Sequence, residues 1–82
     1  MDEVLLRDAH THSMRHRDEL RRSETCGCFH CTATFGYERI QDWSDDGDTA
    51  LCPVCGIDAV IGSDSGIEIT TEFLAAMKAY WF

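Results

Sequence analysis

The sequence predicts a small α+β domain that is held together by a metal ion and carries a helix at each end. Three observations lead to this prediction. The chain has 82 residues, too few to bury a large apolar core, and domains of this size commonly need a metal or disulfides. Two Cys-x-x-Cys pairs lie in the middle of the chain, and the stretches on either side have helical apolar periodicity.

The two cysteine pairs are Cys28–Cys31 and Cys52–Cys55, and residues 32–51 separate them. A Cys-x-x-Cys turn directs both sulfurs toward one metal, and the separating segment is long enough to bring the two turns together as a hairpin. Four thiolates in a tetrahedron form the closed structural site that Zn²⁺ prefers, with Zn–S distances of about 2.3 Å. We therefore predict one structural zinc ion in a zinc ribbon with rubredoxin-like knuckles, bound by Cys28, Cys31, Cys52 and Cys55.

The whole chain, residues 1–82, is predicted to be a single zinc-ribbon domain. The ribbon spans residues 25–62, with an N-terminal helix at residues 1–24 and a C-terminal helix at residues 67–82. A structural zinc ion in a small domain contributes roughly 10–16 kcal/mol of apparent binding free energy. The metal is therefore expected to decide whether the domain folds.

The N-terminal helix is expected to be continuous over residues 2–22, which are rich in Leu, Arg and Glu and contain neither Gly nor Pro. Asp2 is positioned to cap its start. Steps of four, three, four and four residues place a narrow stripe on one face of this helix. The stripe consists of Leu5, Ala9, His12, His16 and Leu20.

The C-terminal helix is expected to begin at Thr70 or Thr71, either of which can cap it, and to run to about Trp81. The helix should pack its apolar face on the ribbon and on the N-terminal helix. That face consists of Ile69, Phe73, Met77 and Tyr80 or Trp81. The final residues Tyr80-Trp81-Phe82 either complete the core or present a hydrophobic patch to a partner.

The segment between the knuckles is expected to hold short strands at residues 34–35 and 49–51, with a turn or short irregular helix at residues 37–43. Another short strand is expected at residues 57–61. The acidic run at residues 45–48 lacks the glycine spacing and distant glutamate of a calcium loop, so a solvated hairpin tip is expected. The predicted small core consists of Phe29, Phe35, Ile40 and Trp43.

Two histidines and an acid on the first helix form a second candidate site. His12 and His16 lie one turn apart and Glu19 lies about one turn beyond, an arrangement that can bind a metal or carry acid–base chemistry. No His-Glu-x-x-His motif is present, and we favour packed rings with local hydrogen bonds. The fifth cysteine, Cys26, is expected to be buried as a small apolar residue; a spare ligand, a group beside the metal and a redox-sensitive thiol are the alternatives.

The chain has a formal net charge of −8, and four thiolates with one Zn²⁺ would make it about −10. Residues 26–82 carry two basic residues against nine acidic ones, which disfavours nucleic acid and suits a basic protein partner. Residues 1–25 are more balanced, with five arginines against six acids. The alternative is therefore a nucleic-acid-associated ribbon that uses Arg15, Arg17, Arg21 and Arg22 together with His30.

The cellular compartment is predicted from the cysteines and the apolar runs. No apolar run approaches the roughly 20 residues of a membrane span, and the first residues lack the apolar region of a secretory signal. An odd number of cysteines with paired Cys-x-x-Cys spacing is typical of a reducing compartment. We therefore expect a cytoplasmic protein without a membrane partner.

From about His12 to Phe82, the chain resembles a family of small zinc-ribbon proteins from bacteria and their viruses, usually described only as cytoplasmic proteins. The resemblance rests on the run Cys26-Gly27-Cys28-Phe29-His30-Cys31, on the run from Thr49 to Asp58, and on isolated matches. These matches are His12-Ser13, His16-Arg17, Ser23, Phe35, Trp43, Val60-Ile61-Gly62 and Trp81-Phe82. It implies a zinc ribbon with helices at both ends, and no established activity. One departure is Gly36-Tyr37, where family members tend to carry a proline-containing turn.

These observations predict a small cytosolic structural-zinc protein, encoded by a bacterium or a phage, that is not an enzyme and acts as a protein-binding module or as a regulator or inhibitor. Four thiolates leave zinc no open position for water or substrate. No Ser-His-Asp set, nucleotide loop or paired-carboxylate signature appears. The less favoured alternatives are the nucleic-acid-associated ribbon and an enzyme that uses His12, His16 and Glu19.

Overall fold

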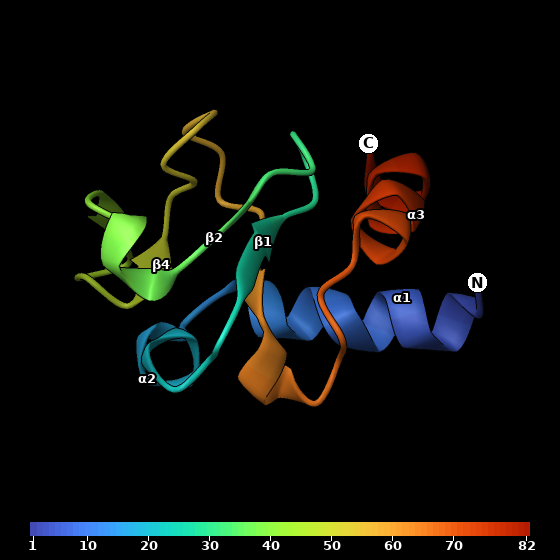
Figure 1. Cartoon of the computed structure of the whole chain (residues 1–82), viewed down its shortest axis with the longest axis horizontal. Helices are drawn as coiled ribbons and strands as arrows, with labels where there is room; N and C mark the ends of the chain where they lie inside the picture. The colour runs from blue at the N-terminus through green and yellow to red at the C-terminus, as the bar shows by residue number, and fades with distance from the viewer.

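The strand that leads into the first cysteine pair lies at the centre of the molecule. The computed structural model describes residues 1–82 as a small α+β fold with two antiparallel sheets. The first sheet has the strand order β2-β1-β5 and the second pairs β3 with β4 (Figure 1). The strands are β1 (Cys26–Cys28), β2 (Thr34–Phe35), β3 (Trp43–Ser44), β4 (Thr49–Ala50) and β5 (Val60–Gly62).

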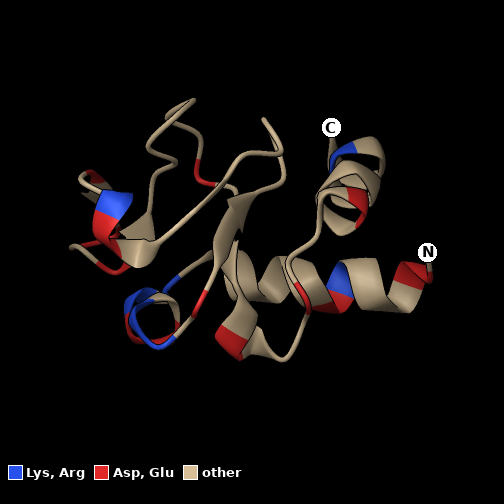
Figure 2. Cartoon of the chain, viewed as in Figure 1, with Lys and Arg blue, Asp and Glu red and all other residues tan.

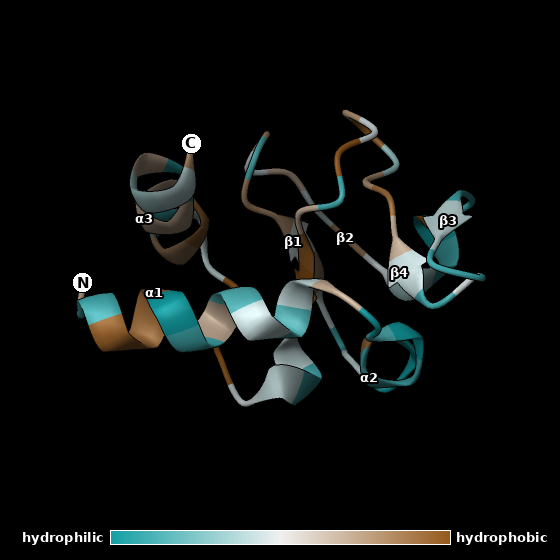
Figure 3. Cartoon of the chain, turned by 180° about the vertical axis from the view of Figure 1, so that it is seen from behind, coloured by the Kyte–Doolittle hydropathy of each residue, from teal (hydrophilic) through white to brown (hydrophobic).

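Helices surround these sheets and make up most of the remaining regular structure. The α-helices are α1 (Glu3–His10), α2 (Arg17–Arg21) and α3 (Thr71–Trp81). Three short 3₁₀ turns complete the regular structure: η1 (Thr11–Ser13), η2 (Tyr37–Arg39) and η3 (Ser63–Ser65). Seen from behind, α1 runs below β1, with α3 above it at one side of the molecule and α2 at the other (Figure 3). None of the helices combines the length and apolar composition needed to cross a membrane.

Strand β1 was not expected from the sequence, because Cys-Gly-Cys contains no β-branched or aromatic residue. Its pairing places Cys26 opposite Phe35 on one side and Gly62 on the other. A Cβ at Gly27 would lie 2.7 Å from the Ile69 side chain and 2.9 Å from that of Leu74. The absence of a side chain at residue 27 therefore lets the start of α3 pack directly on the central strand.

The prediction of one continuous N-terminal helix over residues 2–22 is wrong. Helix α1 ends at His10, η1 follows, and the chain is extended at Met14 and has a positive φ of 48° at Arg15 before α2 begins. The amides at the turn find partners on the tip of the β3–β4 hairpin instead of within a helix. The backbone N–H groups of His16 and Arg17 donate to the Asp48 carbonyl at 2.8 and 3.1 Å, and the Arg15 N–H donates to Thr49 Oγ1.

The helix break also changes which residues of the predicted stripe are buried. Ala9, His16 and Leu20 are buried, whereas Leu6 takes the core position that was expected for Leu5. Leu20 packs closely on Gly62 of β5: a Cβ atom added to this glycine would lie only 2.9 Å from Leu20 Cδ2. The stripe is thus divided between two helices that pack on different parts of the molecule.

The C-terminal helix α3 begins at Thr71, one of the two predicted starts, and not at residue 67. Thr70 caps it, accepting a hydrogen bond from the Phe73 N–H at 3.0 Å, and the helix runs to Trp81. Phe73 and Met77 are buried as predicted, but Leu74 is buried in addition and Trp81 is only partly buried. Helices α1 and α3 lie side by side, and both chain ends are at the same end of the molecule (Figure 1). Trp81 Nε1 donates to the Leu6 carbonyl at 3.2 Å, which ties the two helices together.

The segment between the knuckles contains the predicted short strands but pairs them differently from the simple hairpin we expected. Strand β2 pairs with β1, and β4 pairs with β3 across the acidic tip. Phe29, Phe35 and Ile40 are buried as predicted, whereas Trp43 is half-buried. The strand expected at residues 57–61 is found slightly later, at β5.

Candidate metal centre

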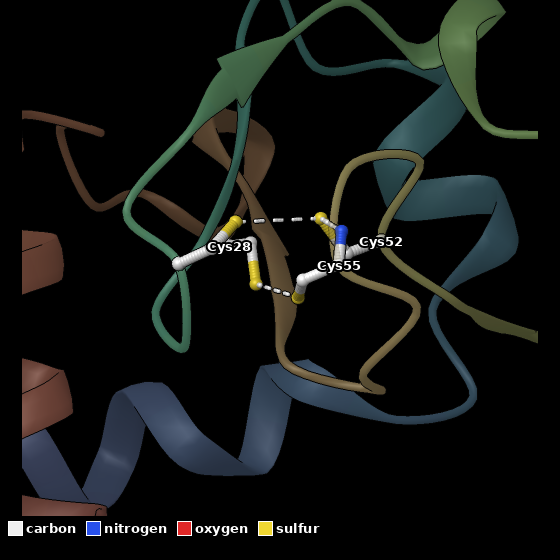
Figure 4. A group of neighbouring side chains, drawn as sticks. Cys28, Cys52 and Cys55 are labelled. Carbon is white, nitrogen blue, oxygen red and sulfur yellow. Dashed lines mark hydrogen bonds between the residues drawn. The ribbon is translucent and has the colours of Figure 1, made fainter.

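Four cysteine sulfurs lie together between the two knuckles, all within 4.8 Å of one another. Cys28 Sγ is 3.7 Å from Cys55 Sγ (Figure 4). Cys31 Sγ is likewise 3.7 Å from Cys52 Sγ. Sulfurs at the corners of a tetrahedron around Zn²⁺ lie about 3.8 Å apart when each Zn–S distance is about 2.3 Å. A disulfide would bring two sulfurs to about 2.05 Å, and all five cysteines are free. The four cysteines are therefore positioned to hold a metal ion.

The two knuckles have the same backbone geometry. In the first, the Thr32 N–H donates to the Cys28 carbonyl at 2.8 Å, and in the second the Gly56 N–H donates to the Cys52 carbonyl at 2.9 Å. The residue after each pair has a positive φ, 64° at Thr32 and 81° at Gly56. Glycine accepts this conformation without strain, and threonine does not. The positive φ of the second knuckle could therefore be predicted from Gly56, whereas Thr32 gives no such signal for the first knuckle.

Backbone amides point at the sulfurs. His30 N–H donates to Cys28 Sγ at 3.4 Å and Val54 N–H donates to Cys52 Sγ at 3.3 Å. Burial raises the pKa of Cys28 strongly despite its amide partners. Burial also tends to raise the pKa of Cys52, but hydrogen bonds from the Cys55 and Val54 amides and from neighbouring thiols outweigh it and leave the pKa lowered.

The donor set fits a divalent cation. Four thiols this close cannot all ionise against burial and mutual repulsion unless a positive charge lies among them. Thiolate ligands and a closed tetrahedral arrangement are those of a structural zinc site. When bound, the ion would supply cross-linking of the two knuckles, which are otherwise joined through the short strands.

Cys26 is not part of this cluster. It is fully buried in β1, and its nearest polar partner is the Leu20 carbonyl, 3.9 Å from Sγ. Burial, and secondarily the charge of Glu38, raises the pKa of Cys26 to about 11. The thiol is therefore neutral near pH 7 and behaves as the small apolar residue that was expected.

The histidine pair does not form a second metal site. His16 is buried with both ring nitrogens engaged, Nδ1 with the His12 carbonyl at 2.6 Å and Nε2 with the Ala50 N–H at 3.1 Å. The His12 ring instead contacts the Glu19 carboxylate, with Nδ1 2.9 Å from Oε1. This agrees with the favoured prediction of local hydrogen bonds, and the Cys28–Cys55 group is the only cluster of three or more potential ligands. The His12–Glu19 pair lines a polar hollow of about 380 Å³.

Three of the four arginines in the nucleic-acid alternative are engaged within the protein. Arg17 lies 4.2 Å from the centre of the Trp43 ring and donates to the Gly47 carbonyl. Arg21 pairs with Asp18, and Arg22 pairs with Asp64 at 3.0 Å. Figure 2 shows basic and acidic residues interleaved on α2. The two ion pairs offset the charges of Arg21 and Arg22, which leaves fewer free cations for a phosphate backbone.

Aromatic rings gather where α3 ends beside the first knuckle. Phe29 is buried, and its ring centre lies 5.9 Å from that of Phe82 and 6.0 Å from that of His10. Phe82 also meets His30 edge-on, and Nδ1 of His30 is buried without a hydrogen-bond partner. His10, which the sequence analysis did not single out, stacks 4.1 Å from Trp81. The only sequence signal for His10 was its spacing: it lies four residues after Leu6, on the same face of α1.

Neither sequence nor structure comparison places the chain in a known group. No protein-family model, curated protein or solved structure matches it. The resemblance to small bacterial and phage zinc-ribbon proteins therefore stays a prediction.

Proposed function

We propose that this chain is a non-enzymatic structural-zinc protein of the zinc-ribbon type, whose role is to bind another protein as a module or regulator. The observation that carries the proposal is the aromatic surface beside the metal centre. Trp81 and Phe82 pack one side against α1 and the first knuckle and leave much of their area exposed. Aromatic residues that are partly exposed on a rigid scaffold are the usual anchors of protein interfaces.

The chemistry of the metal centre supports a structural role for the ion. Four thiolates would complete the coordination of Zn²⁺, so no position remains for water or substrate. The backbone amides of His30 and Val54 point at the sulfurs and favour their charged form, as expected for a permanent site.

Charge and cysteine chemistry support the remaining parts of the proposal. A formal charge of −8 favours a basic protein surface over nucleic acid or an anionic membrane. Five free cysteines suit a reducing compartment, which supports a cytoplasmic location as part of the proposal. Membership of the bacterial and phage zinc-ribbon family belongs to the same proposal.

The proposal is tested by capture from a cell lysate at physiological salt, with the zinc-loaded chain as bait and with nuclease treatment. We expect one protein to be recovered in a fixed ratio to the bait, and to be lost with the Cys52→Ser variant, which cannot complete the metal site. Recovery of nucleic acid alone without nuclease, with steep loss as salt is raised, would favour the nucleic-acid alternative.

A further inference from the structure

A groove of about 220 Å³ lies beside the first knuckle, and five of its eight lining residues are hydrophobic. Its walls come from four separate parts of the chain: residues 10–14 at the end of α1 and the helix break, Phe29 in the knuckle, residues 58–59, and residues 81–82 at the end of α3. The volume lies below the roughly 300–1,000 Å³ of sites for drug-sized ligands, so the groove suits a single side chain.

The apolar walls are exposed to a degree that is unusual for such residues. Met14 is 51 % exposed, Trp81 38 % and Phe82 64 %, whereas Phe29 at the base is buried. The rings are held by one another, since Trp81 stacks on His10 and Phe82 packs on Phe29. A fixed aromatic base with exposed apolar walls is the form of a pocket that receives an anchoring side chain.

The charge around the groove selects the chemistry of the occupant. Asp58 is the only Asp, Glu, Lys or Arg residue in the lining. The chain as a whole carries a formal net charge of −8. A segment with positive charge beside its apolar anchor would therefore be attracted, and an acidic segment would be repelled.

We propose that this groove binds one aliphatic side chain of a partner protein, carried on a short segment whose flanking residues are Lys or Arg. The inference rests on the proposed protein-binding function and names the chemistry of the partner. The side chain would lie against Phe29 between Met14 and Phe82, and the flanking cations would lie toward Asp58.

The test uses the zinc-loaded full chain labelled with ¹⁵N and three end-blocked synthetic peptides, KRLRK, KRGRK and EDLDE. The two tryptophan indole N–H signals report on different places. Trp81 lines the groove, whereas Trp43, on β3, lies outside it and is covered by the Arg17 side chain. We expect KRLRK to shift the Trp81 signal saturably and to leave the Trp43 signal unchanged. Both other peptides should bind at least tenfold more weakly.

Surface variants locate the binding site. Phe82→Ala and Met14→Ser should weaken KRLRK at least fivefold while retaining the metal and the dispersed amide spectrum, since both side chains are more than half exposed. Asp58→Asn should weaken KRLRK and reduce its preference over EDLDE. Val54→Ala is the matched control, because Val54 is 62 % exposed on the second knuckle and lies outside the groove.

Several results would overturn the inference. Equal binding of KRLRK and KRGRK would show that charge alone acts, and equal binding of KRLRK and EDLDE would show that charge does not act. The absence of a Trp81 shift, or an equal effect of Val54→Ala, would remove the groove as the site. A Trp81 shift that depends on protein concentration without peptide would assign the groove to a second copy of the chain.

The two proposals fail separately. If a captured partner binds Phe82→Ala and Met14→Ser as tightly as the unaltered chain, the protein-binding function stands and the groove is excluded. If KRLRK binds as expected but no protein partner is captured, the groove chemistry stands and the proposed function fails.

Discussion

Residues with positive φ mark the positions where tertiary contacts fix the backbone. Apart from glycines, they are Arg15, Thr32, Asp45 and Asp46. Arg15 lies at the break between η1 and α2. Asp45 and Asp46 lie at the tip of the β3–β4 hairpin, next to Asp48, whose carbonyl accepts the N–H groups at the start of α2. Thr32 is the most unusual, because a β-branched side chain is strongly disfavoured in this region. Its position in the first knuckle matches that of Gly56 in the second.

Replacing Thr32 by glycine should stabilise the zinc-loaded protein. The relief of backbone strain outweighs the added freedom of the unfolded chain, so we expect a gain of about 1 kcal/mol in the free energy of unfolding. The matched change Gly56→Ala should cost about 1 kcal/mol, because it introduces the same strain in the second knuckle. Denaturant unfolding of both variants at fixed zinc measures the effect. A loss of stability for Thr32→Gly would contradict it.

Acid should weaken the fold through His16. Burial lowers the pKa of His16 below 6.5, despite the opposing His12 carbonyl and the charges of Glu19 and Asp48. The unfolded chain therefore binds a proton at a higher pH than the folded chain does. The His16 contribution to stability is complete above pH 6.5 and is lost as the pH falls from there toward the lowered pKa. In the folded protein, His16 Nε2 accepts a hydrogen bond from the Ala50 N–H. Protonation of Nε2 would replace this hydrogen bond with two N–H groups that face each other.

The cysteine ligands also bind protons in acid, so a variant must isolate the histidine. His16→Gln keeps a side-chain carbonyl that can accept the Ala50 N–H but does not titrate. We expect the unaltered protein to lose stability below pH 6.5 more steeply than His16→Gln, by up to about 1.4 kcal/mol per pH unit. Urea unfolding between pH 5.5 and 7.5 in excess zinc tests this. Parallel curves for the two proteins would exclude His16 as the cause.

At the scale of elements, the contact between α1 and α3 depends on Trp81. The indole combines a hydrogen bond to the Leu6 carbonyl with stacking on His10, yet the ring is only partly buried. Full removal of a buried aromatic side chain costs about 3–5 kcal/mol, so a partly exposed ring should contribute less.

Trp81→Ala should therefore cost about 2 kcal/mol and lower the melting temperature by roughly 10 °C. Zinc stoichiometry should stay at one, because no metal ligand lies on either helix. The control is Val4→Ala on the exposed side of α1, which should leave the melting temperature nearly unchanged. Calorimetry measures the melting temperature and metal analysis the zinc stoichiometry. An unchanged melting temperature for Trp81→Ala would show that the contact between α1 and α3 does not contribute to stability.

At the scale of the whole molecule, the cysteine cluster connects two knuckles that lie more than twenty positions apart in the chain. The strands around it are only two or three residues long, and such strands have little stability of their own. A metal ion held by this cluster would therefore be expected to stabilise the sheet β2-β1-β5.

Removal of the metal should unfold the chain. Cys52→Ser leaves three thiolates for an ion that prefers four, and most of the roughly 10–16 kcal/mol of metal binding should be lost. A strong chelator should have the same effect on the unaltered protein, seen as loss of far-UV circular dichroism and of a cooperative melt. Cys26→Ser, which lies outside the cluster, should keep one zinc per chain. A melt that is insensitive to chelation would contradict a structural metal.

The sequence by itself determined the features that depend on residues close together in the chain. The four clustered cysteines follow from their spacing, and the caps at Asp2 and Thr70 follow from side chains that reach amides two or three residues away. The end of α3 and the burial of Cys26 were likewise predicted from local pattern. These interactions form in the same way wherever the segment lies in the fold.

Only the tertiary structure decided the features that depend on distant partners. Residues 2–22 have strong helical propensity, yet the Asp48 carbonyl and the Thr49 hydroxyl, more than thirty residues away, take the amides of residues 15–17 and break the helix. Strand β1 exists because β2 and β5 pair with it, although its own sequence is a poor strand. The groove beside the first knuckle joins four separate parts of the chain in the same way. Local propensity is worth only tenths of a kcal/mol per residue, so hydrogen bonds and burial contributed by distant segments override it.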